Sequence, residues 1–140
     1  MKSILVTGGA GFIGANLVEL LIEKYPTYKF VVIDLLTYAG DVNNLKNVKK
    51  AKNFTFVQGD ICDRALIERI FHHYYINGVI HLAAESHVDN SISNPGVFIE
   101  TNVNGTFTLI DVAYKHWMEK PFVFKLGFGI VDFYTYLQMR

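Results

Sequence analysis

The sequence predicts an α/β fold in which a parallel sheet carries helices on both faces. Short continuous apolar runs, which are typical of buried parallel strands, alternate four times with segments of helical spacing. Apolar residues make up 51% of the 140 residues, enough for one domain with one core, and this content argues against disorder. Strands joined by right-handed crossovers are expected to hold ligands at their carboxyl ends.

The first half of the chain is expected to supply three strands. Residues 4–6 form the first strand, and the spacing then becomes helical until Pro26 ends the helix. Residues 30–33 and 54–57 are the second and third strands, with a short, weak helix over residues 42–49 between them.

The second half is expected to supply a fourth strand between two helices. Asp63 is a good N-cap for a helix whose apolar residues run to Phe71. Residues 78–82 form the fourth strand, and Pro95 opens a longer helix that continues to about Trp117.

Composition limits the classes of partner. A net charge of zero gives no support for nucleic acid or an acidic membrane as a partner. The single cysteine, Cys62, excludes an internal disulfide, and the apolar run at residues 4–6 is too short for a signal or membrane segment. His72 and His73 suit a helix end, and His81 suits a hydrogen-bonded core position, so no metal site is assigned. A cytoplasmic location is expected.

A glycine-rich turn follows the first strand. Gly8, Gly11 and Gly14 lie at three-residue spacing, which allows a tight turn into the helix and a close approach of backbone to a pyrophosphate. Asp34 lies 20 positions past Gly14, where its carboxylate can accept hydrogen bonds from ribose hydroxyls and would repel a 2′-phosphate. With no arginine nearby, the pattern favours NAD over NADP. The alternative is a structural turn with a capping aspartate.

Three other features keep a functional and a structural interpretation. Asp60 ends the third strand and could face an adenine amino group or be a solvated turn residue. Residues 83–87, Ala-Ala-Glu-Ser-His, could line a site or form a plain loop. Tyr25 and Lys29 match a Tyr-x-x-x-Lys pattern, but Pro26 breaks the helix that would place both on one face, so they are not assigned as a catalytic pair.

Together these segments resemble the extended short-chain dehydrogenase/reductase family, and within it the dTDP-glucose 4,6-dehydratases. Two stretches are particular to nucleotide-sugar 4,6-dehydratases: Leu-Thr-Tyr-Ala-Gly at residues 36–40 and His-Leu-Ala-Ala-Glu-Ser-His-Val-Asp at residues 81–89. Residues 6–14, 59–63 and 98–106 also match. The resemblance covers residues 1–117 and implies a Rossmann-like sheet, incomplete at about four of the family's strands, with NAD as cofactor.

The resemblance also implies which residues contact NAD. The turn and the residues after it would meet the pyrophosphate, the next group the adenosine ribose and adenine, and the last group would pass along the cofactor. Ser86 would in addition reach the sugar substrate. The implied contacts are Gly8, Gly11, Phe12, Ile13 and Gly14, then Asp34, Leu35, Leu36 and Thr37, then Asp60 and Ile61, and finally Leu82, Ala83, Ala84, Glu85, Ser86 and Thr101. Leu35 departs from the family pattern, where lysine is usual.

In this family, NAD takes hydride from C4 of the sugar, water leaves across C5 and C6, and the hydride returns to C6. The reaction needs a tyrosine base with its lysine and an Asp–Glu pair, which in the family follow the fifth strand. None is identifiable here, so no catalytic residue is assigned and the chain alone is expected to be inactive. The resemblance implies dTDP-glucose as substrate and a homodimer, with dimerisation of this chain left open. The alternatives are part of a nucleotide-sugar 4-epimerase and a non-catalytic NAD-binding module.

The end of the chain departs from the family. Residues 133–140 can be encoded so that a shift of two nucleotides yields Leu-His-Ile-Ser-Thr-Asp-Glu, which is the family's next strand. We therefore divide the chain into an NAD-binding part, residues 1–117, and a divergent tail, residues 118–140, with a frameshift and truncation as the hypothesis. A genuinely different apolar tail is the alternative.

Overall fold

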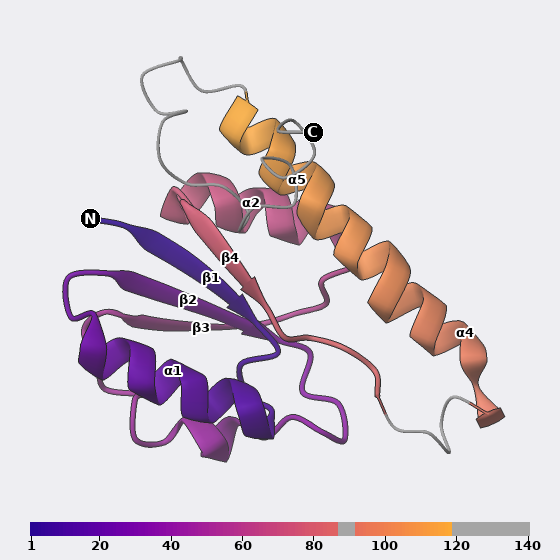
Figure 1. Ribbon diagram of the computed structural model, residues 1–140, viewed down its shortest axis with the longest axis horizontal. Helices are drawn as coiled ribbons and strands as arrows, with labels where there is room; N and C mark the ends of the chain where they lie inside the picture. The colour runs from indigo at the N-terminus through magenta and orange to yellow at the C-terminus, as the bar shows by residue number, and fades with distance from the viewer. Residues whose placement is uncertain (87–91, 119–140) are drawn as a thin grey trace, which may run out of the picture.

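The computed structural model describes residues 1–86 and 92–118, so the predicted tail after Met118 lies outside the described residues. Within the described part, one parallel sheet has the strand order β3-β2-β1-β4 (Figure 1). This sheet and its helices confirm the predicted fold class. The strands are β1 Ser3–Thr7, β2 Lys29–Asp34, β3 Phe54–Gln58 and β4 Gly78–His81.

The strands end in register, which brings four loops to one edge of the sheet. Thr7 pairs with Ile33 on one side and with His81 on the other. The ladder continues into the loops, because the Gly8 N–H donates to the Ile33 carbonyl at 2.9 Å and the Gly59 N–H donates to the Asp34 carbonyl at 3.0 Å. The carboxyl edge therefore gathers residues that are far apart in the sequence.

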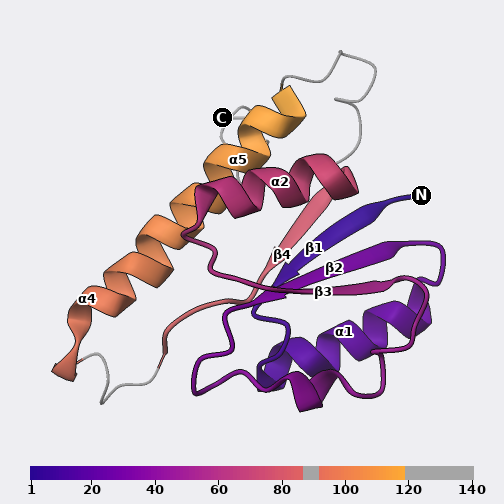
Figure 2. The same cartoon turned by 180° about the vertical axis from the view of Figure 1, so that it is seen from behind.

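Helices cover both faces of the sheet, as predicted (Figures 1 and 2). Helix α1, Phe12–Lys24, lies on one face, and α2, Arg64–Tyr74, lies with α5, Thr106–Met118, on the other. A cluster of buried residues lies on each face of the sheet, and consecutive residues of β1 contribute to different clusters because side chains alternate across a strand. Leu5 joins the cluster under α2 and α5, whereas Val6 joins the cluster under α1.

Local sequence signals set the helix boundaries. The Asp63 carboxylate accepts a hydrogen bond from the Leu66 N–H at 3.0 Å, which confirms the predicted N-cap of α2. Helix α1 ends before Pro26, also as predicted. The helix expected over residues 42–49 is shorter: only Val42–Leu45 is helical, as a 3₁₀ turn, because residues 46–50 continue as turns around the buried Leu45.

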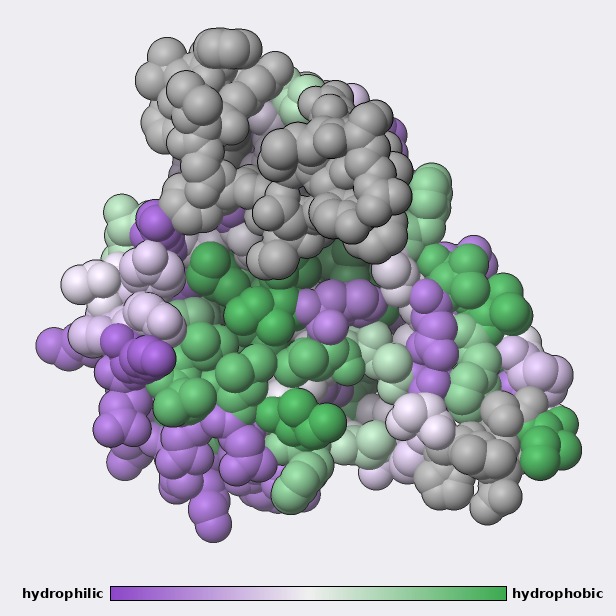
Figure 3. Space-filling view, in the orientation of Figure 1, coloured by the Kyte–Doolittle hydropathy of each residue, from purple (hydrophilic) through white to green (hydrophobic). Residues whose placement is uncertain are grey.

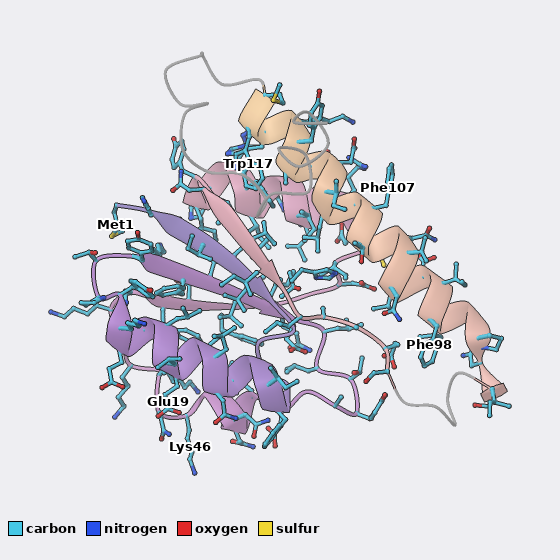
Figure 4. All side chains as sticks on the ribbon, in the orientation of Figure 1. Met1, Glu19, Lys46, Phe98, Phe107 and Trp117 are labelled. Atoms are coloured by element: carbon cyan, nitrogen blue, oxygen red, sulfur yellow. The ribbon has the colours of Figure 1, made fainter. Side chains whose placement is uncertain are left out.

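The long helix expected from Pro95 to about Trp117 is present, but it is not a regular α-helix. It consists of α4 Pro95–Phe98, a π-helical segment η2 Ile99–Gly105, and α5. Figure 4 shows Trp117 on the side of α2, where its indole N–H donates to the Ile76 carbonyl at 2.9 Å, and Phe107 pointing away from the sheet. Among the described residues, no helix has the length and apolar character needed to cross a bilayer.

Removing a core side chain of α2 should destabilise the fold. Ile67 is fully buried, so Ile67→Ala leaves a cavity and should lower the free energy of unfolding by about 2–5 kcal/mol. Leu20→Ala is the matched control, because Leu20 is 55% exposed on α1. Urea unfolding followed by circular dichroism measures both variants; equal losses would contradict the assigned core.

Candidate functional site

A hollow of about 400 Å³ lies at the carboxyl edge of the sheet, where the loops after all four strands meet. We call it the strand-end hollow. Its lining residues are Gly8, Gly11, Phe12, Ile13, Gly14, Ile33, Asp34, Leu35, Thr37, Ala39, Gly40, Gly59, Asp60, Ile61, Leu82, Ala83, Ala84, Glu85, Ser86 and Thr101. Every contact predicted from the sequence is in this set except Leu36. The structure therefore brings residues from five separate stretches of the sequence to one place.

Leu36 is the exception because its backbone is left-handed, with φ of 60°. Its N–H donates to the Asp34 carboxylate, and its side chain packs against the core cluster beneath α1. Four lining residues were not predicted: Ile33, Ala39, Gly40 and Gly59. Ala39 and Gly40 belong to the Leu-Thr-Tyr-Ala-Gly stretch, so that motif held a signal for them.

A side chain would have a different effect at each of the three glycines of the turn. Gly8 has φ of 68°, and a Cβ there would lie 2.6 Å from the Ala83 nitrogen. A Cβ at Gly14 would collide with the Gly8 carbonyl oxygen. A Cβ at Gly11 meets nothing closer than 3.4 Å, so the protein's own packing does not require glycine there. A side chain at Gly11 would instead occupy the strand-end hollow.

The amino end of α1 faces the same space. Gly11 is the N-cap and offers no side-chain hydrogen bond, and the first-turn N–H groups of Phe12 and Ile13 have no acceptor within the helix. Both residues line the hollow, and their side chains extend into solvent. The positive end of the helix dipole and free amides of this kind are the groups to which anions bind at helix starts, and α1 is 13 residues long.

Asp34 holds the turn in place and also faces the hollow. Its Oδ2 accepts from the Ala10 N–H and its Oδ1 from the Leu36 N–H, both at 2.9 Å. A carboxylate offers about four acceptor positions, so two of them remain. The capping and ligand-binding interpretations of the sequence are thus compatible: one residue fixes the glycine turn and can still accept two hydroxyl groups.

A buried hydroxyl joins β1 to β4. The Thr7 Oγ1 accepts from the N–H groups of Leu82 and Ala83, each at 3.2 Å, so its proton is directed to the Nδ1 of His81 at 2.6 Å. The Nε2–H of His81 then donates to the Thr106 hydroxyl at 3.0 Å. Both ring nitrogens are hydrogen-bonded, as expected, but the predicted core position is wrong. His81 is exposed, because β4 is the edge strand of the described sheet.

A turn after β3 forms another part of the lining of the hollow. The Asp60 carboxylate accepts from the Cys62 N–H at 2.9 Å, as a turn residue would, and Asp60 also lines the hollow. The Cys62 thiol donates to the Glu100 carbonyl at 3.3 Å. Burial, together with the neighbouring Asp60 charge, raises the pKa of Cys62 to about 12, so the thiol stays protonated.

The hollow is acidic. Asp34, Asp60 and Glu85 are among its lining residues, and none of the described lining residues is a lysine, arginine or histidine. The Tyr38 hydroxyl donates to the Glu85 carboxylate at 3.2 Å and so links the loop after β2 to the loop after β4. Within residues 1–86 and 92–118, no group of three or more metal-ligating side chains is present. Backbone amides and the hydroxyls of Thr37, Ser86 and Thr101 are the donors that these residues offer to a phosphate.

The rejected Tyr-x-x-x-Lys match lies at the other edge of the sheet. Tyr25 follows the carboxyl end of α1 and stacks on Tyr28, with ring centroids 5.4 Å apart. Lys29 begins β2, and its Nζ lies over the Tyr74 ring at 4.6 Å. The two side chains therefore contact different rings and do not approach the strand-end hollow.

Comparisons with known proteins agree on one family. A family model described as GDP-mannose 4,6 dehydratase matches residues 5–126. The dTDP-glucose 4,6-dehydratase of Salmonella typhimurium is 51% identical over 115 residues, which is 81% of this chain and 31% of that protein. The chain thus spans about a third of the length of the curated relatives that it matches.

Solved structures share this fold. DesIV, a dTDP-glucose 4,6-dehydratase from Streptomyces venezuelae solved with NAD bound, is 45% identical, with a TM-score of 0.75 over 82% of this chain and 36% of its own. A UDP-glucose 4-epimerase from Thermotoga maritima is 38% identical, with a TM-score of 0.73 over 82% of this chain and 35% of its own.

Protonation of His81 should destabilise the chain in mild acid. Burial holds the pKa of His81 below its ordinary value of 6.5. The folded chain therefore binds this proton less readily than the unfolded chain, so stability is complete above pH 6.5 and is lost as the pH falls through the lowered pKa. Thermal unfolding between about pH 8 and pH 5 measures this loss.

In that experiment, His81→Gln should show a weaker dependence on pH than the wild-type chain. His73→Gln, in the last turn of α2, is the matched control, because it removes an imidazole that lies outside this network. Identical pH profiles for all three proteins would contradict the assigned network.

Proposed function

The chain belongs to the family described as GDP-mannose 4,6 dehydratase, and on this premise we propose that it is the NAD-binding part of a dTDP-glucose 4,6-dehydratase. The observation that carries the proposal is the space reserved over Gly11, beside the amino end of α1 and the carboxylate of Asp34. Two relatives that carry this enzyme name support the proposal: the Salmonella typhimurium protein is 51% identical to the chain, and the Streptomyces venezuelae protein is 45% identical.

The strand-end hollow fits the parts of NAD. The amides of Phe12 and Ile13 would hold the pyrophosphate, with Gly11 leaving room for it. The free acceptor positions of Asp34 would take the ribose hydroxyls, and Asp60 with Ile61 would flank adenine. When bound, NAD would supply the hydride acceptor for oxidation at C4 of the sugar.

The charge of the hollow favours NAD over NADP. An added 2′-phosphate would meet the Asp34 carboxylate, and within residues 1–86 and 92–118 no cationic side chain lines the hollow to offset the repulsion. Leu35 contributes to this preference, because it places an apolar side chain beside Asp34 where family members usually carry lysine.

For the reaction itself, the described residues supply binding rather than proton transfer. Residues 82–86 would lie along the cofactor, with Ser86 toward the sugar, and Thr101 would complete that wall. The tyrosine base with its lysine and the Asp–Glu pair have no counterpart among the lining residues. We therefore expect this chain to bind NAD without turning over dTDP-glucose. We also propose that a frameshift explains why the sequence departs from the family after residue 117.

A nucleotide-sugar 4-epimerase is the second candidate, because the Thermotoga maritima epimerase matches the fold almost equally well. Its identity is lower, 38% against 45% for the Streptomyces venezuelae dehydratase. The two activities differ in product, since only the dehydratase converts its substrate into a 4-keto-6-deoxy sugar. A cytoplasmic location without a membrane or nucleic-acid partner is part of the proposal, in keeping with the neutral net charge.

An apolar stripe on the long helix supports self-association. Its exposed members recur every three or four residues, a spacing that favours one side of a helix. Figure 3 shows hydrophobic residues, in green, on the right of the molecule where the long helix runs. Such a stripe is expected to be covered by a partner, and the family resemblance points to a second subunit. The stripe consists of Ile99, Val103, Phe107, Ile110, Tyr114 and Met118.

Calorimetric titration tests the cofactor proposal. The wild-type chain should bind NAD more tightly than NADP, and Gly11→Ala should weaken NAD binding by roughly tenfold or more, because its methyl group enters the pyrophosphate position. Thermal stability should change little in this variant, since the added Cβ meets no protein atom closer than 3.4 Å. Gly96→Ala, outside the hollow, is the control. Tighter binding of NADP, or unchanged affinity in Gly11→Ala, would refute the proposal.

Sedimentation velocity tests whether the stripe mediates self-association. Phe107 is 62% exposed at its centre, so Phe107→Glu should shift the chain from dimer toward monomer by placing a charge in an apolar contact. Leu20→Glu is the control, because Leu20 is similarly exposed but lies on α1. A wild-type chain that stays monomeric at about 100 μM would show that the stripe does not mediate dimerisation.

A further inference from the structure

One side chain makes both of its amide hydrogen bonds to the backbone of a single residue. The Asn102 Oδ1 accepts from the Glu85 N–H at 2.8 Å, and its Nδ2 donates to the Glu85 carbonyl at 2.9 Å. Glu85 lies beyond β4 in a loop without regular structure and lines the strand-end hollow. Asn102 thus provides this loop with the pairing that a neighbouring strand would provide in a sheet.

The π-helical segment η2 brings Asn102 to this position. Its neighbour Thr101 lines the hollow, while Ile99 and Val103 stay exposed on the other side of the segment. A π turn holds more residues than an α turn, so it changes which side chains face a given direction. Regular helices on either side can therefore keep their own contacts while Asn102 faces the loop.

Three further contacts hold η2 against the strand ends. Gly105 packs so closely on Ile61 that a Cβ there would lie 2.6 Å from the isoleucine Cδ1. The Glu100 carbonyl accepts from the Cys62 thiol, and the first residue after η2, Thr106, accepts from His81. Asn102 is therefore presented from a supported segment, not from a free helix surface.

The loop over residues 82–86 is consequently fixed from two directions. Thr7 holds the N–H groups of Leu82 and Ala83 from the side of β1, and Asn102 holds Glu85 from the side of η2. Without Asn102, the far end of the loop would keep only the Tyr38 contact to the Glu85 side chain among the bonds described. A ligand lying along this wall would then have to order the loop, which weakens binding.

We propose that Asn102 is a positioning residue that sets the backbone of residues 82–86 for a dinucleotide before it binds. The inference rests on the proposed function, because it concerns the wall along which NAD would lie. It assigns to η2 the task of shaping the site, in addition to any contact that Thr101 makes.

Asn102→Asp gives a test with a pH signature. The new carboxylate can still accept from the Glu85 N–H but repels the Glu85 carbonyl, whereas its protonated form has an O–H that donates to that carbonyl. NAD affinity relative to wild type should be about tenfold lower at about pH 8 and should recover as the pH falls toward the pKa of the new carboxyl. Asn102→Ala should lose affinity without this recovery.

Asn104→Asp is the matched control. Asn104 lies in the same segment, is exposed, and donates to the Glu100 carboxylate, so the substitution adds the same charge without touching Glu85. Because its new carboxylate also repels Glu100, it reports the effect of charge and strain within η2. The affinity loss in Asn102→Asp should exceed the loss in Asn104→Asp, and the excess measures the contact with Glu85. Taking each variant relative to wild type removes the effect of His81 protonation.

Amide hydrogen exchange at Glu85 in the cofactor-free chain separates the inference from the proposed function. The Glu85 N–H should be protected in the wild-type chain and in Asn104→Asp, and should exchange faster in Asn102→Ala. Faster exchange with unchanged NAD affinity would overturn the positioning role and leave NAD binding intact. A protected Glu85 in a wild-type chain that binds no NAD would overturn both.

Discussion

The backbone of Gly8 passes so close to the Leu82–Ala83 peptide that no side chain fits between them. This close approach depends on the left-handed φ of Gly8 and on the Thr7 hydroxyl, which accepts from both N–H groups of the neighbouring loop. The end of β1 is therefore the common support of the glycine turn on one side and of the loop after β4 on the other. The strand-end hollow lies between these two loops, so its shape follows from that contact.

A site built in this way recognises its ligand mainly through backbone. The amino end of α1 offers amides to an anion. The carboxylates of Asp34 and Asp60 accept hydrogen bonds from backbone N–H groups of their own turns and keep other acceptor positions open. Because none of the described lining residues is cationic, we propose that charge disfavours an additional phosphate, while the amides at the start of α1 bind the phosphates that reach them. Family membership and site chemistry thus support the same cofactor by independent routes.

Features encoded by neighbouring residues could be predicted from the sequence. The strands, α1, the Asp63 cap and the glycine turn are of this kind, since apolar spacing and capping chemistry act over a few residues. The inward packing of Leu36 could not be predicted, because it depends on a left-handed residue beside Asp34. The π-helical segment was also missed, and so were the bonds between Asn102 and Glu85, which join a helix to a loop 17 positions away. Motif position indicated which residues line the hollow but not which of them hold its walls.

The central proposal is that the amino end of α1 holds the pyrophosphate of NAD while the loop after β4 lies along the cofactor. Backbone amide chemical shifts, recorded as NAD is added to the ¹⁵N-labelled chain, test this most directly. The largest shifts should fall on Gly11, Phe12 and Ile13 and on residues 82–86, with small shifts at the opposite edge around Tyr25. Saturable shifts confined to other parts of the chain, with those two segments unchanged, would contradict the account.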